Sequence, residues 1–436
     1  ESITVLDPAC GSGHILVVAY DVLKAIYLER GYRLRDIPRL ILEKNLYGLD
    51  IDDRAAQLAG FALLMKARAD DRRLLADPEN PPQLNILSLQ ESQGLDAQAL
   101  HAALAAVPQA QASTGLTQQA IAELIATFAH AKTFGSLIQI GPQRLPSLRE
   151  QLSILKSAEA SGDLYAQAAA KDLLPLVRQA LVLGMQFDAV VANPPYMGGK
   201  GMNPALKAYA KDSFPDSKAD LFAMFMERGF GWCKPSGFNS MVTMQSWMFL
   251  SSYEAMREKL LQERTLSCMV HMGNGVMGIA FGTAATVMLR GHVSDYAGSF
   301  SYCENEDIGE DEKPKAFPVQ NERLKTTKPD DFKKIPGSPV AYWISRKTRE
   351  AFDQGCLSEY IDAKQGLATA NNDKFLKYWW ELNFISINFT AKNREEAVKS
   401  EKKWFPYNKG GEFRKWHGNQ EHVVNWKNDG YEIRNY

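Results

Sequence analysis

The sequence has no long apolar run, few cysteines and no excess of charge of either sign. No stretch reaches about 18 apolar residues, so the sequence predicts no membrane-spanning segment. Fifty Lys and Arg residues balance 51 Asp and Glu residues, which gives a formal net charge of −1. This balance excludes a wholly basic protein that coats nucleic acid, but it allows a local basic groove. The five cysteines lie far apart and include no C-x-x-C pair: Cys10, Cys233, Cys268, Cys303 and Cys356. This spacing argues against a zinc ribbon or a disulfide framework and favours a reducing cytoplasm.

Several chemical signatures are also missing. The seven histidines form no H-x-x-x-H or similar pattern, so no metal site is predicted. No G-x-S-x-G elbow marks a hydrolase nucleophile, and no PD-(D/E)-x-K nuclease signature occurs in a strand context. The composition, 45% hydrophobic and 23% charged over 436 residues, is that of a globular protein with roughly two or three domains.

Strand and helix patterns alternate over the first 290 residues. An apolar run at 3–7 ends in a glycine-containing turn, and helical periodicity follows over 14–30. The repetition of this pattern predicts an α/β fold with a doubly wound, mostly parallel, Rossmann-like sheet. The other expected strands cover 46–51, 85–89, 187–192 and 238–244, and the other expected helices cover 53–68 and 220–234.

The rest of the chain departs from this alternation. Residues 90–186 are rich in Ala, Gln and Leu, so we expect a mostly helical insertion within a first domain of residues 1–295. An acidic stretch in 296–335 indicates a linker, and 336–436, rich in Trp, Tyr, Asn and Lys, is expected to start an α+β domain. The sequence opens on its own strand without an initiator Met and ends in mid-pattern, so we expect both ends to be incomplete.

The turn after the first strand, DPACGSG at 7–13, is the first candidate binding site. Its two glycines let the backbone approach a ligand, and the following helix presents free N–H groups. A P-loop would need a Lys that is absent, and a dinucleotide site would need a glycine where Leu16 stands and an acid about 20 residues later. The next acid at a strand end is Asp50, 37 positions after Gly13. S-adenosylmethionine remains, with Asp50 accepting hydrogen bonds from the ribose hydroxyls, and a plain tight turn is the alternative.

The second candidate site is the tetrapeptide N-P-P-Y, which ends the strand expected at 187–192. The exocyclic amine of adenine is a poor nucleophile because its lone pair is shared with the ring. The amide oxygen of Asn193 and the carbonyl of Pro194 can accept its two hydrogens and aim the lone pair at a sulfonium methyl group. Pro195 stiffens the turn, and Tyr196 offers a face on which the base can stack. A rigid turn at a strand end is the alternative.

These motifs resemble the amino-methyltransferases of DNA modification systems in which the cofactor motif precedes N-P-P-Y and a recognition domain follows. DPACGSG (7–13) resembles their cofactor motif, GLDID (48–52) their ribose motif, and DLFAMFMERGFGWCKPSG (220–237) the helix and turn after the catalytic motif. More narrowly, QGLATANNDKFLKYW (365–379) and KKWFPYNKGGEFRKWHGN (402–419) resemble PglX-type adenine methyltransferases of BREX phage-defence systems.

The resemblance implies further site residues and two departures from the family pattern. Phe281 in AFGTA (280–284) is expected to pack against an extruded base, with a core role as the alternative. SLQ (88–90) stands where relatives carry an acid, so the contact with the cofactor's adenine is expected to be weaker or to come from Ser88. The family motif that precedes the cofactor loop lies outside the sequence. The implied cofactor-binding residues are Asp7, Pro8, Ala9, Cys10, Gly11, Gly13, Asp50, Ile51 and Ser88.

Two basic regions are candidates for contact with DNA. Residues 197–219 are rich in Gly, Pro and Lys, and we expect a mobile loop in which lysines such as Lys200 and Lys207 contact phosphates. Residues 391–416 carry eight Lys and Arg against four acids, interleaved with aromatic side chains. An ordinary surface loop and a solvated face are the alternatives. The candidate DNA-binding residues in this second region are Lys402, Lys403, Lys409, Arg414 and Lys415.

The motifs together predict an S-adenosylmethionine-dependent DNA adenine-N6 methyltransferase that acts in phage defence, with other proteins of the defence system as partners. The target base must leave the duplex to reach the N-P-P-Y pocket. Methylation of a glutamine amide in protein is one alternative, because N-P-P-Y suits any planar amide or aromatic amine. A non-catalytic DNA-reading subunit is the other, and the intact Asn193 and Tyr196 argue against it.

Overall fold

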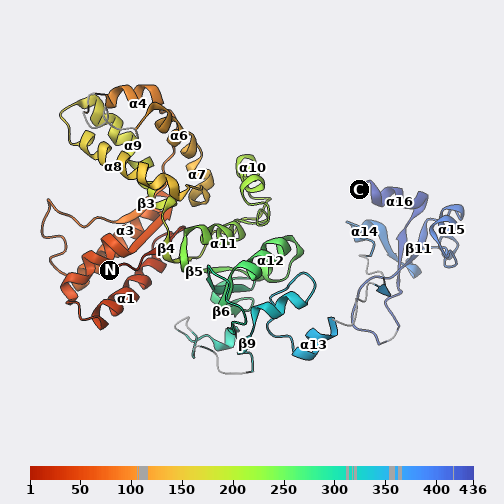
Figure 1. Ribbon diagram of the computed structural model, residues 1–436. Helices are drawn as coiled ribbons and strands as arrows, with labels where there is room; N and C mark the ends of the chain where they lie inside the picture. The colour runs from red at the N-terminus through yellow and green to blue at the C-terminus, as the bar shows by residue number, and fades with distance from the viewer. Residues whose placement is uncertain are drawn as a thin grey trace. The chain divides into compact units, whose positions relative to one another are not determined.

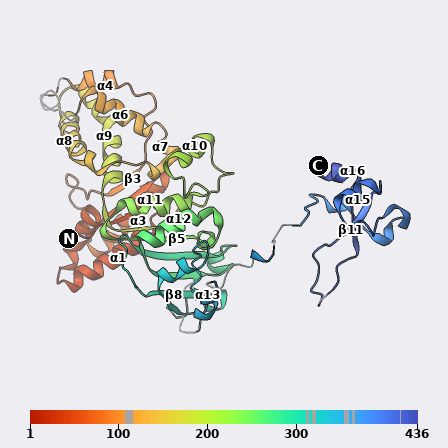
Figure 2. The ribbon, with the colours of Figure 1, turned by 45° about the vertical axis from the view of Figure 1, so that its right-hand side comes forward.

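The structure, a computed structural model, forms two compact units (Figures 1 and 2). It describes residues 1–105, 107, 116–310, 314–316, 318, 322–352, 359–361, 366–415 and 417–436. The first unit covers Glu1–Gln354 and the second covers Gly355–Tyr436. Within the described residues, no helix is both long enough and apolar enough to cross a membrane.

A nine-stranded sheet organises the first unit, in the order β3-β2-β1-β4-β5-β7-β6-β8-β9. The five strands from β3 to β5 run parallel, and β7 lies antiparallel between β5 and β6. The predicted α/β class with a mostly parallel, doubly wound sheet is therefore confirmed. The strands are β1 (Val5–Asp7), β2 (Leu46–Asp50), β3 (Asn85–Ser88), β4 (Phe187–Ala192), β5 (Cys233–Met244), β6 (Thr265–Met272), β7 (Thr283–Leu289), β8 (Gly298–Cys303) and β9 (Lys325–Thr327).

Helices cover both faces of this sheet because successive strand residues point to opposite sides. Val5 and Leu46 pack with α1 (His14–Glu29) and α3 (Asp53–Asp70) on one face. The next residue along β1, Leu6, packs on the other face, in the core that includes α11 (Leu221–Trp232). Figure 2 shows α11 and α12 (Glu254–Glu263) together over one side of the strands. The carboxyl ends of β1, β2 and β4 therefore meet between two helical layers, at the place where the strand order reverses.

The segment between β3 and β4 folds mostly as helices that share one core with the sheet. Its longest helix, α9, buries a face rich in Ala and Leu, which lets neighbouring helices approach closely. A short 3₁₀ turn, Gly135–Leu137, follows α7 and contacts the loop after β1 through a hydrogen bond from Ser136 to Pro8. The α-helices that the structure describes in this insertion are α4 (Ala97–Leu104), α6 (Gln118–Phe128), α7 (Ala131–Phe134), α8 (Leu145–Glu159) and α9 (Leu164–Gly184).

The loop predicted at 197–219 contains a packed helix, so that prediction is wrong over α10 (Pro204–Ser213). The Asn203 side chain caps the helix by accepting a hydrogen bond from the Leu206 N–H, at 2.8 Å. Leu206 and Ala210 are buried on its inner face. The glycines of the segment precede the helix, and Pro204 is at its start, where a missing N–H costs nothing.

The expected boundaries at 295 and 336 differ from the division that the structure has. Strands β8 and β9 occupy part of the segment expected to be a linker, because β8 pairs in parallel with β6 and β9 pairs with β8. The first unit then runs on through α13 (Arg346–Ala351) to Gln354. Short edge strands carry too little alternation to stand out in a sequence.

The second unit has a three-stranded antiparallel sheet in the order β10-β12-β11. Ile387, Trp404 and Val423 form its small buried core. Its strands are β10 (Leu376–Tyr378), β11 (Trp404–Tyr407) and β12 (His422–Asn425), and its helices are α14 (Asn372–Phe375), α15 (Arg394–Lys399) and α16 (Lys427–Arg434).

Candidate active site

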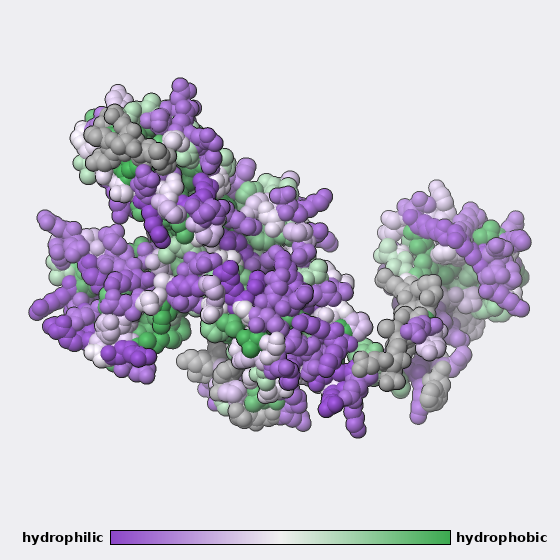
Figure 3. All heavy atoms as spheres, in the orientation of Figure 1, coloured by the Kyte–Doolittle hydropathy of each residue, from purple (hydrophilic) through white to green (hydrophobic). Residues whose placement is uncertain are grey.

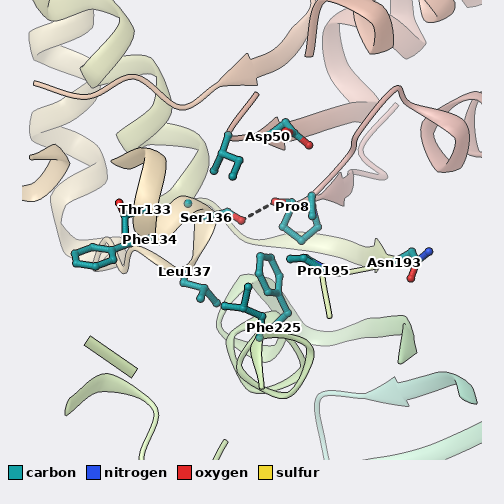
Figure 4. A pocket seen from close by; sticks show the side chains of 13 residues that line it. Pro8, Asp50, Thr133, Phe134, Ser136, Leu137, Asn193, Pro195 and Phe225 are labelled. Carbon is teal, nitrogen blue, oxygen red and sulfur yellow. Dashed lines mark hydrogen bonds between the residues drawn. The ribbon is translucent and has the colours of Figure 1, made fainter. Parts of the chain in front are cut away.

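A cavity of about 290 Å³ opens at the carboxyl ends of β1, β2 and β4. Figure 4 shows the side chains that converge on it from the sheet, from α11 and from the insertion. The sheet edge gives the cavity one carboxylate and several apolar surfaces. The lining residues are Pro8, Ala9, Asp50, Ile51, Thr133, Phe134, Gly135, Ser136, Leu137, Asn193, Pro195, Leu221 and Phe225.

Asp50 ties the glycine turn to the end of β2. One of its carboxylate oxygens accepts a hydrogen bond from the Gly11 N–H and the other from the Asp52 N–H, each at 2.8 Å. Each oxygen keeps a second lone pair, so the carboxylate can still accept hydrogen bonds from two hydroxyl groups of a ligand. The ribose role expected for Asp50 stays a prediction.

Asp7 lies beneath the same turn and is only 1% exposed. Its carboxylate accepts a hydrogen bond from the Ala9 N–H at 3.1 Å, which fixes the start of the turn. Burial raises the pKa of Asp7 to about 7, and the nearby Asp50 adds a smaller increase.

The two glycines of the turn shape it without lining the cavity. Gly11 and Gly13 both have positive φ, 52° and 86°. A Cβ on Gly13 would lie 2.9 Å from the Cα and Cβ of Ala59, so this glycine lets the turn pack directly on α3. The neighbouring Cys10 is buried in the core under α1, and burial raises the pKa of its thiol.

The N-P-P-Y segment places its side chains at the end of β4. Asn193 and Pro195 line the cavity, whereas Pro194 is buried. The Tyr196 hydroxyl lies 3.1 Å from Asn193 Oδ1 and 3.2 Å from the Val242 carbonyl oxygen. It can donate a hydrogen bond to either oxygen. Burial raises the pKa of Tyr196 to about 12, so the hydroxyl stays protonated at neutral pH.

Phe281 lies beside Tyr196, and the base-stacking role expected for the two rings stays a prediction. Their ring centroids are 5.8 Å apart with an interplanar angle of 63°, and Phe281 remains 37% exposed. Asp220, at the start of α11, accepts a hydrogen bond from the Met197 N–H at 2.9 Å. That bond holds the chain after Tyr196 against the helix.

The insertion supplies a wall that the sequence analysis missed. Thr133 to Leu137 line the cavity, and the Ser136 hydroxyl donates a 2.6 Å hydrogen bond to the Pro8 carbonyl oxygen. Ser136 and Pro8 are 128 positions apart, and no motif in the insertion marks the contact.

Ser88, by contrast, does not line the cavity. Its hydroxyl accepts a 2.7 Å hydrogen bond from the Gln90 amide, which also donates to Asp53. The adenine contact suggested for Ser88 therefore has no support in this arrangement and stays a prediction.

The basic candidates differ in their surroundings. Lys200, Lys207, Lys211 and Lys218 are exposed, and none of the four has an ion-pair partner among the residues that the structure describes. In the second unit, Lys402 donates to the Ile385 carbonyl oxygen at 2.7 Å. No group of His, Cys, Asp and Glu in the described part of the chain could hold a metal ion.

The second region keeps its mixture of basic and aromatic side chains. Lys403 lies over the Trp404 ring, 5.5 Å from its centroid, and Arg414 pairs with Glu421 at 3.3 Å. Lys409 is half-buried, Lys415 is exposed, and Trp416 lies outside the described residues. Figure 3 shows hydrophobic patches on this unit between hydrophilic side chains.

Comparisons with known proteins identify relatives over the whole chain. The model of the Eco57I restriction-modification methylase family matches residues 44–277. The adenine-specific methyltransferase BrxX of Escherichia coli O9:H4 (strain HS) is 47% identical over all of this chain and 36% of its own length. The adenine-specific methyltransferase PglX of Lacticaseibacillus casei (strain Zhang) is 35% identical, also over all of this chain and 36% of its own length. The chain thus spans about a third of the length of these relatives. A solved structure of a type I restriction-modification system gives a TM-score of 0.42 and 15% identity, over 79% of this chain and 54% of that one.

Proposed function

The chain belongs to the Eco57I restriction-modification methylase family, and from this premise we propose that it transfers a methyl group from S-adenosylmethionine to N6 of adenine in duplex DNA. The resemblance to PglX-type methyltransferases drawn from the sequence is confirmed by the relatives named BrxX and PglX. Both relatives are named adenine-specific, which favours adenine over a glutamine amide.

One observation carries the proposal: Asn193 lines the same cavity as Asp50, Pro8 and Ala9. The amide at the end of β4 and the carboxylate at the end of β2 therefore lie on either side of the turn after β1. A cofactor with its ribose at Asp50 would place its reactive carbon near Asn193. Neither the packing of the fold nor the glycine turn alone requires an amide at that position.

The residues of the cavity fit S-adenosylmethionine. Asp50 has lone pairs left for two ribose hydroxyls, and Ile51 and Phe225 provide apolar surfaces for a purine. The cofactor supplies an electrophilic methyl group on a positively charged sulfur. Asp7 and the Ser136–Pro8 hydrogen bond hold the turn that shapes the pocket.

Asn193 binds and orients the target amine in this proposal. Its Oδ1 accepts one amine hydrogen, and the carbonyl oxygen of Pro194 accepts the other, which localises the lone pair on nitrogen. Tyr196 donates to Asn193 Oδ1 and so fixes which end of the amide faces the base. The bound cofactor would supply the methyl group and leave as its thioether, and the methylated amine nitrogen would release a proton to solvent.

Access to this pocket requires that the adenine leave the duplex. Tyr196 and Phe281, in contact and partly exposed, are the surfaces proposed to stack on the extruded base. Lys200 and Lys207 are proposed to contact phosphates, and so are the basic residues of the second unit, which we propose as the start of a target-recognition domain. The names of the relatives also lead us to propose a role in BREX phage defence with partner proteins of that system.

Transfer of a tritiated methyl group by the full-length protein to duplex DNA tests the proposal, with Asn193→Ala as the variant. We expect label in DNA with the wild type, a loss of at least 100-fold with the variant, and cofactor affinity within about twofold of wild type. Label in protein instead of DNA would favour the glutamine alternative. DNA binding without transfer by the wild type would favour a non-catalytic reading subunit.

A further inference from the structure

The turn from Thr133 to Leu137 closes one end of the cavity, although it comes from the insertion and not from the sheet. We infer that this turn is the wall against which the adenosyl half of the cofactor binds, with the Thr133 hydroxyl hydrogen-bonded to the edge of the adenine. The inference rests on the proposed function and names a cofactor contact that the family motifs do not contain.

The turn is fastened to both strands that carry the cofactor motifs. Ser136, 2% exposed, donates to the Pro8 carbonyl oxygen after β1 at 2.6 Å. Lys132 donates to the Ile51 carbonyl oxygen after β2 at 2.7 Å and pairs with Asp53 at 2.8 Å. Anchors on two strands set the position of the wall relative to the pocket.

The backbone of the turn also lies directly against β2. Gly135 has a φ of +58°, and a Cβ on it would lie 3.0 Å from the Ile51 Cγ2 atom. This residue therefore has both a conformational and a steric reason to be glycine. The segment is built to approach the residue that follows the ribose-binding acid.

The sheet order determines which half of the cofactor meets this wall. Along β3-β2-β1-β4, the ribose acid Asp50 ends β2 and the catalytic Asn193 follows β4. The reactive methyl must face Asn193, so the adenine must extend to the opposite side, past β2. Figure 4 places Thr133 and Asn193 at opposite ends of the cavity.

The end of β3, where a family acid would contact the adenine, is already occupied. The Ser88 hydroxyl and the Asp53 carboxylate both accept hydrogen bonds from the Gln90 amide, at 2.7 and 2.8 Å. Leu89 is fully buried, and none of residues 88–90 lines the cavity. A polar contact to the adenine edge must therefore come from another element.

Thr133 is the polar side chain of the wall that is available for this contact. It is half-buried, it lines the cavity, and its hydroxyl has no hydrogen-bond partner among the described residues. The Ser136 hydroxyl is bonded to Pro8, and the Leu137 carbonyl oxygen accepts from the Tyr209 hydroxyl at 2.9 Å. A threonine hydroxyl can donate to a ring nitrogen or accept from the adenine amine.

Titration calorimetry with S-adenosylhomocysteine tests the inference on the full-length protein. Thr133→Val keeps the shape of the side chain and removes the hydroxyl, so we expect a dissociation constant three- to tenfold higher, as for one lost hydrogen bond. Thr127→Val is the matched control, because Thr127 lies in the same insertion and its hydroxyl donates to the Glu123 carbonyl oxygen at 2.7 Å. The control should change the constant less than twofold.

A cofactor analogue tests whether the contact is made with the N1 and N6 edge of the adenine, which hypoxanthine changes as a whole. The wild type should bind S-adenosylhomocysteine more tightly than the hypoxanthine analogue S-inosylhomocysteine, and Thr133→Val should reduce that preference. An unchanged preference, or a dissociation constant for Thr133→Val within twofold of wild type, would overturn the contact.

A bulky variant keeps the test independent of a single hydrogen bond. Thr133→Trp should fill the adenosyl end of the cavity and weaken the binding of S-adenosylhomocysteine at least 50-fold. The melting temperature of the ligand-free protein and its DNA binding should stay near wild type. Undiminished binding by this variant would show that the wall is elsewhere. If the wild type itself fails to bind S-adenosylhomocysteine, the proposed function falls with the inference; if it binds equally with and without the Thr133 hydroxyl, the inference alone falls.

Discussion

Single residues at the ends of β2 and β4 are the ones proposed to carry the chemistry, and two of them were recognisable from the sequence by type and spacing. Asp50 and Asn193 each follow an apolar strand, and the parallel sheet brings both to one cavity. Ser136 gave no such signal because its partner, the Pro8 carbonyl oxygen, is distant in sequence. Thr133 gave none because only the fold brings it to the cavity. Long-range contacts of small polar side chains follow from the fold and are not visible in local patterns.

Tyr196 is expected to act through Asn193 as well as through its ring. Tyr196→Phe removes the hydrogen bond to Asn193 Oδ1 and should lower methyl transfer up to about tenfold, with cofactor affinity unchanged. Tyr196→Ala also removes the stacking surface and should cost about 1–3 kcal/mol more. Tyr165→Phe, at a side chain that is 79% exposed, is the control. Full activity of Tyr196→Phe would show that the hydroxyl does not position the amide.

The buried Asp7 should make stability depend on pH. Burial raises the pKa of Asp7 from the usual 3.8 to about 7. Its contribution to the free energy of unfolding is therefore fully present below about pH 4 and is lost as the pH rises to about 7. Asp7→Asn keeps an oxygen for the Ala9 N–H and cannot ionise, so it should melt at a higher temperature than wild type at pH 8. The difference in melting temperature between Asp7→Asn and wild type should close towards pH 4. A gap that does not change across this range would contradict the buried, raised pKa.

At the scale of elements, the central strands and their helices followed from apolar runs and helical periodicity, whereas α10, β8 and β9 did not. Glycines before α10 and a proline at its start gave the segment the composition of a loop, yet the Asn203 cap and the buried Leu206 make it helical. Strand β8 depends on pairing with β6, and the edge strand β9 depends on pairing with β8, which no local pattern records.

The lysines of α10 are exposed and free of ion pairs within the described residues, so they suit contact with phosphates. The double variant Lys207→Ala, Lys211→Ala should weaken DNA binding. It should also reduce the slope of the logarithm of DNA affinity against the logarithm of salt concentration by about 2. Cofactor affinity should not change. Lys156→Ala with Lys171→Ala, on α8 and α9, is the matched control with the same loss of charge. Equal salt slopes for both pairs would mean that α10 does not face DNA.

At the scale of the whole molecule, residues of the glycine turn and of the N-P-P-Y segment line one cavity of the first unit, and the second unit is a small domain with a mixture of basic and aromatic side chains. The chain spans 36% of the length of its relatives BrxX and PglX. The family and the fold class could be predicted from the sequence because their motifs are local. The division into units could not, since it depends on which strands join the large sheet.

The central claim is that Asn193 and the cofactor turn form one site for the methylation of an adenine amine. Mass spectrometry of nucleosides from DNA treated with the full-length protein and S-adenosylmethionine tests it most directly. The account predicts N6-methyldeoxyadenosine as the only new nucleoside, and none above background with Asn193→Ala. A methylated cytosine, or an undiminished yield from Asn193→Ala, would contradict it.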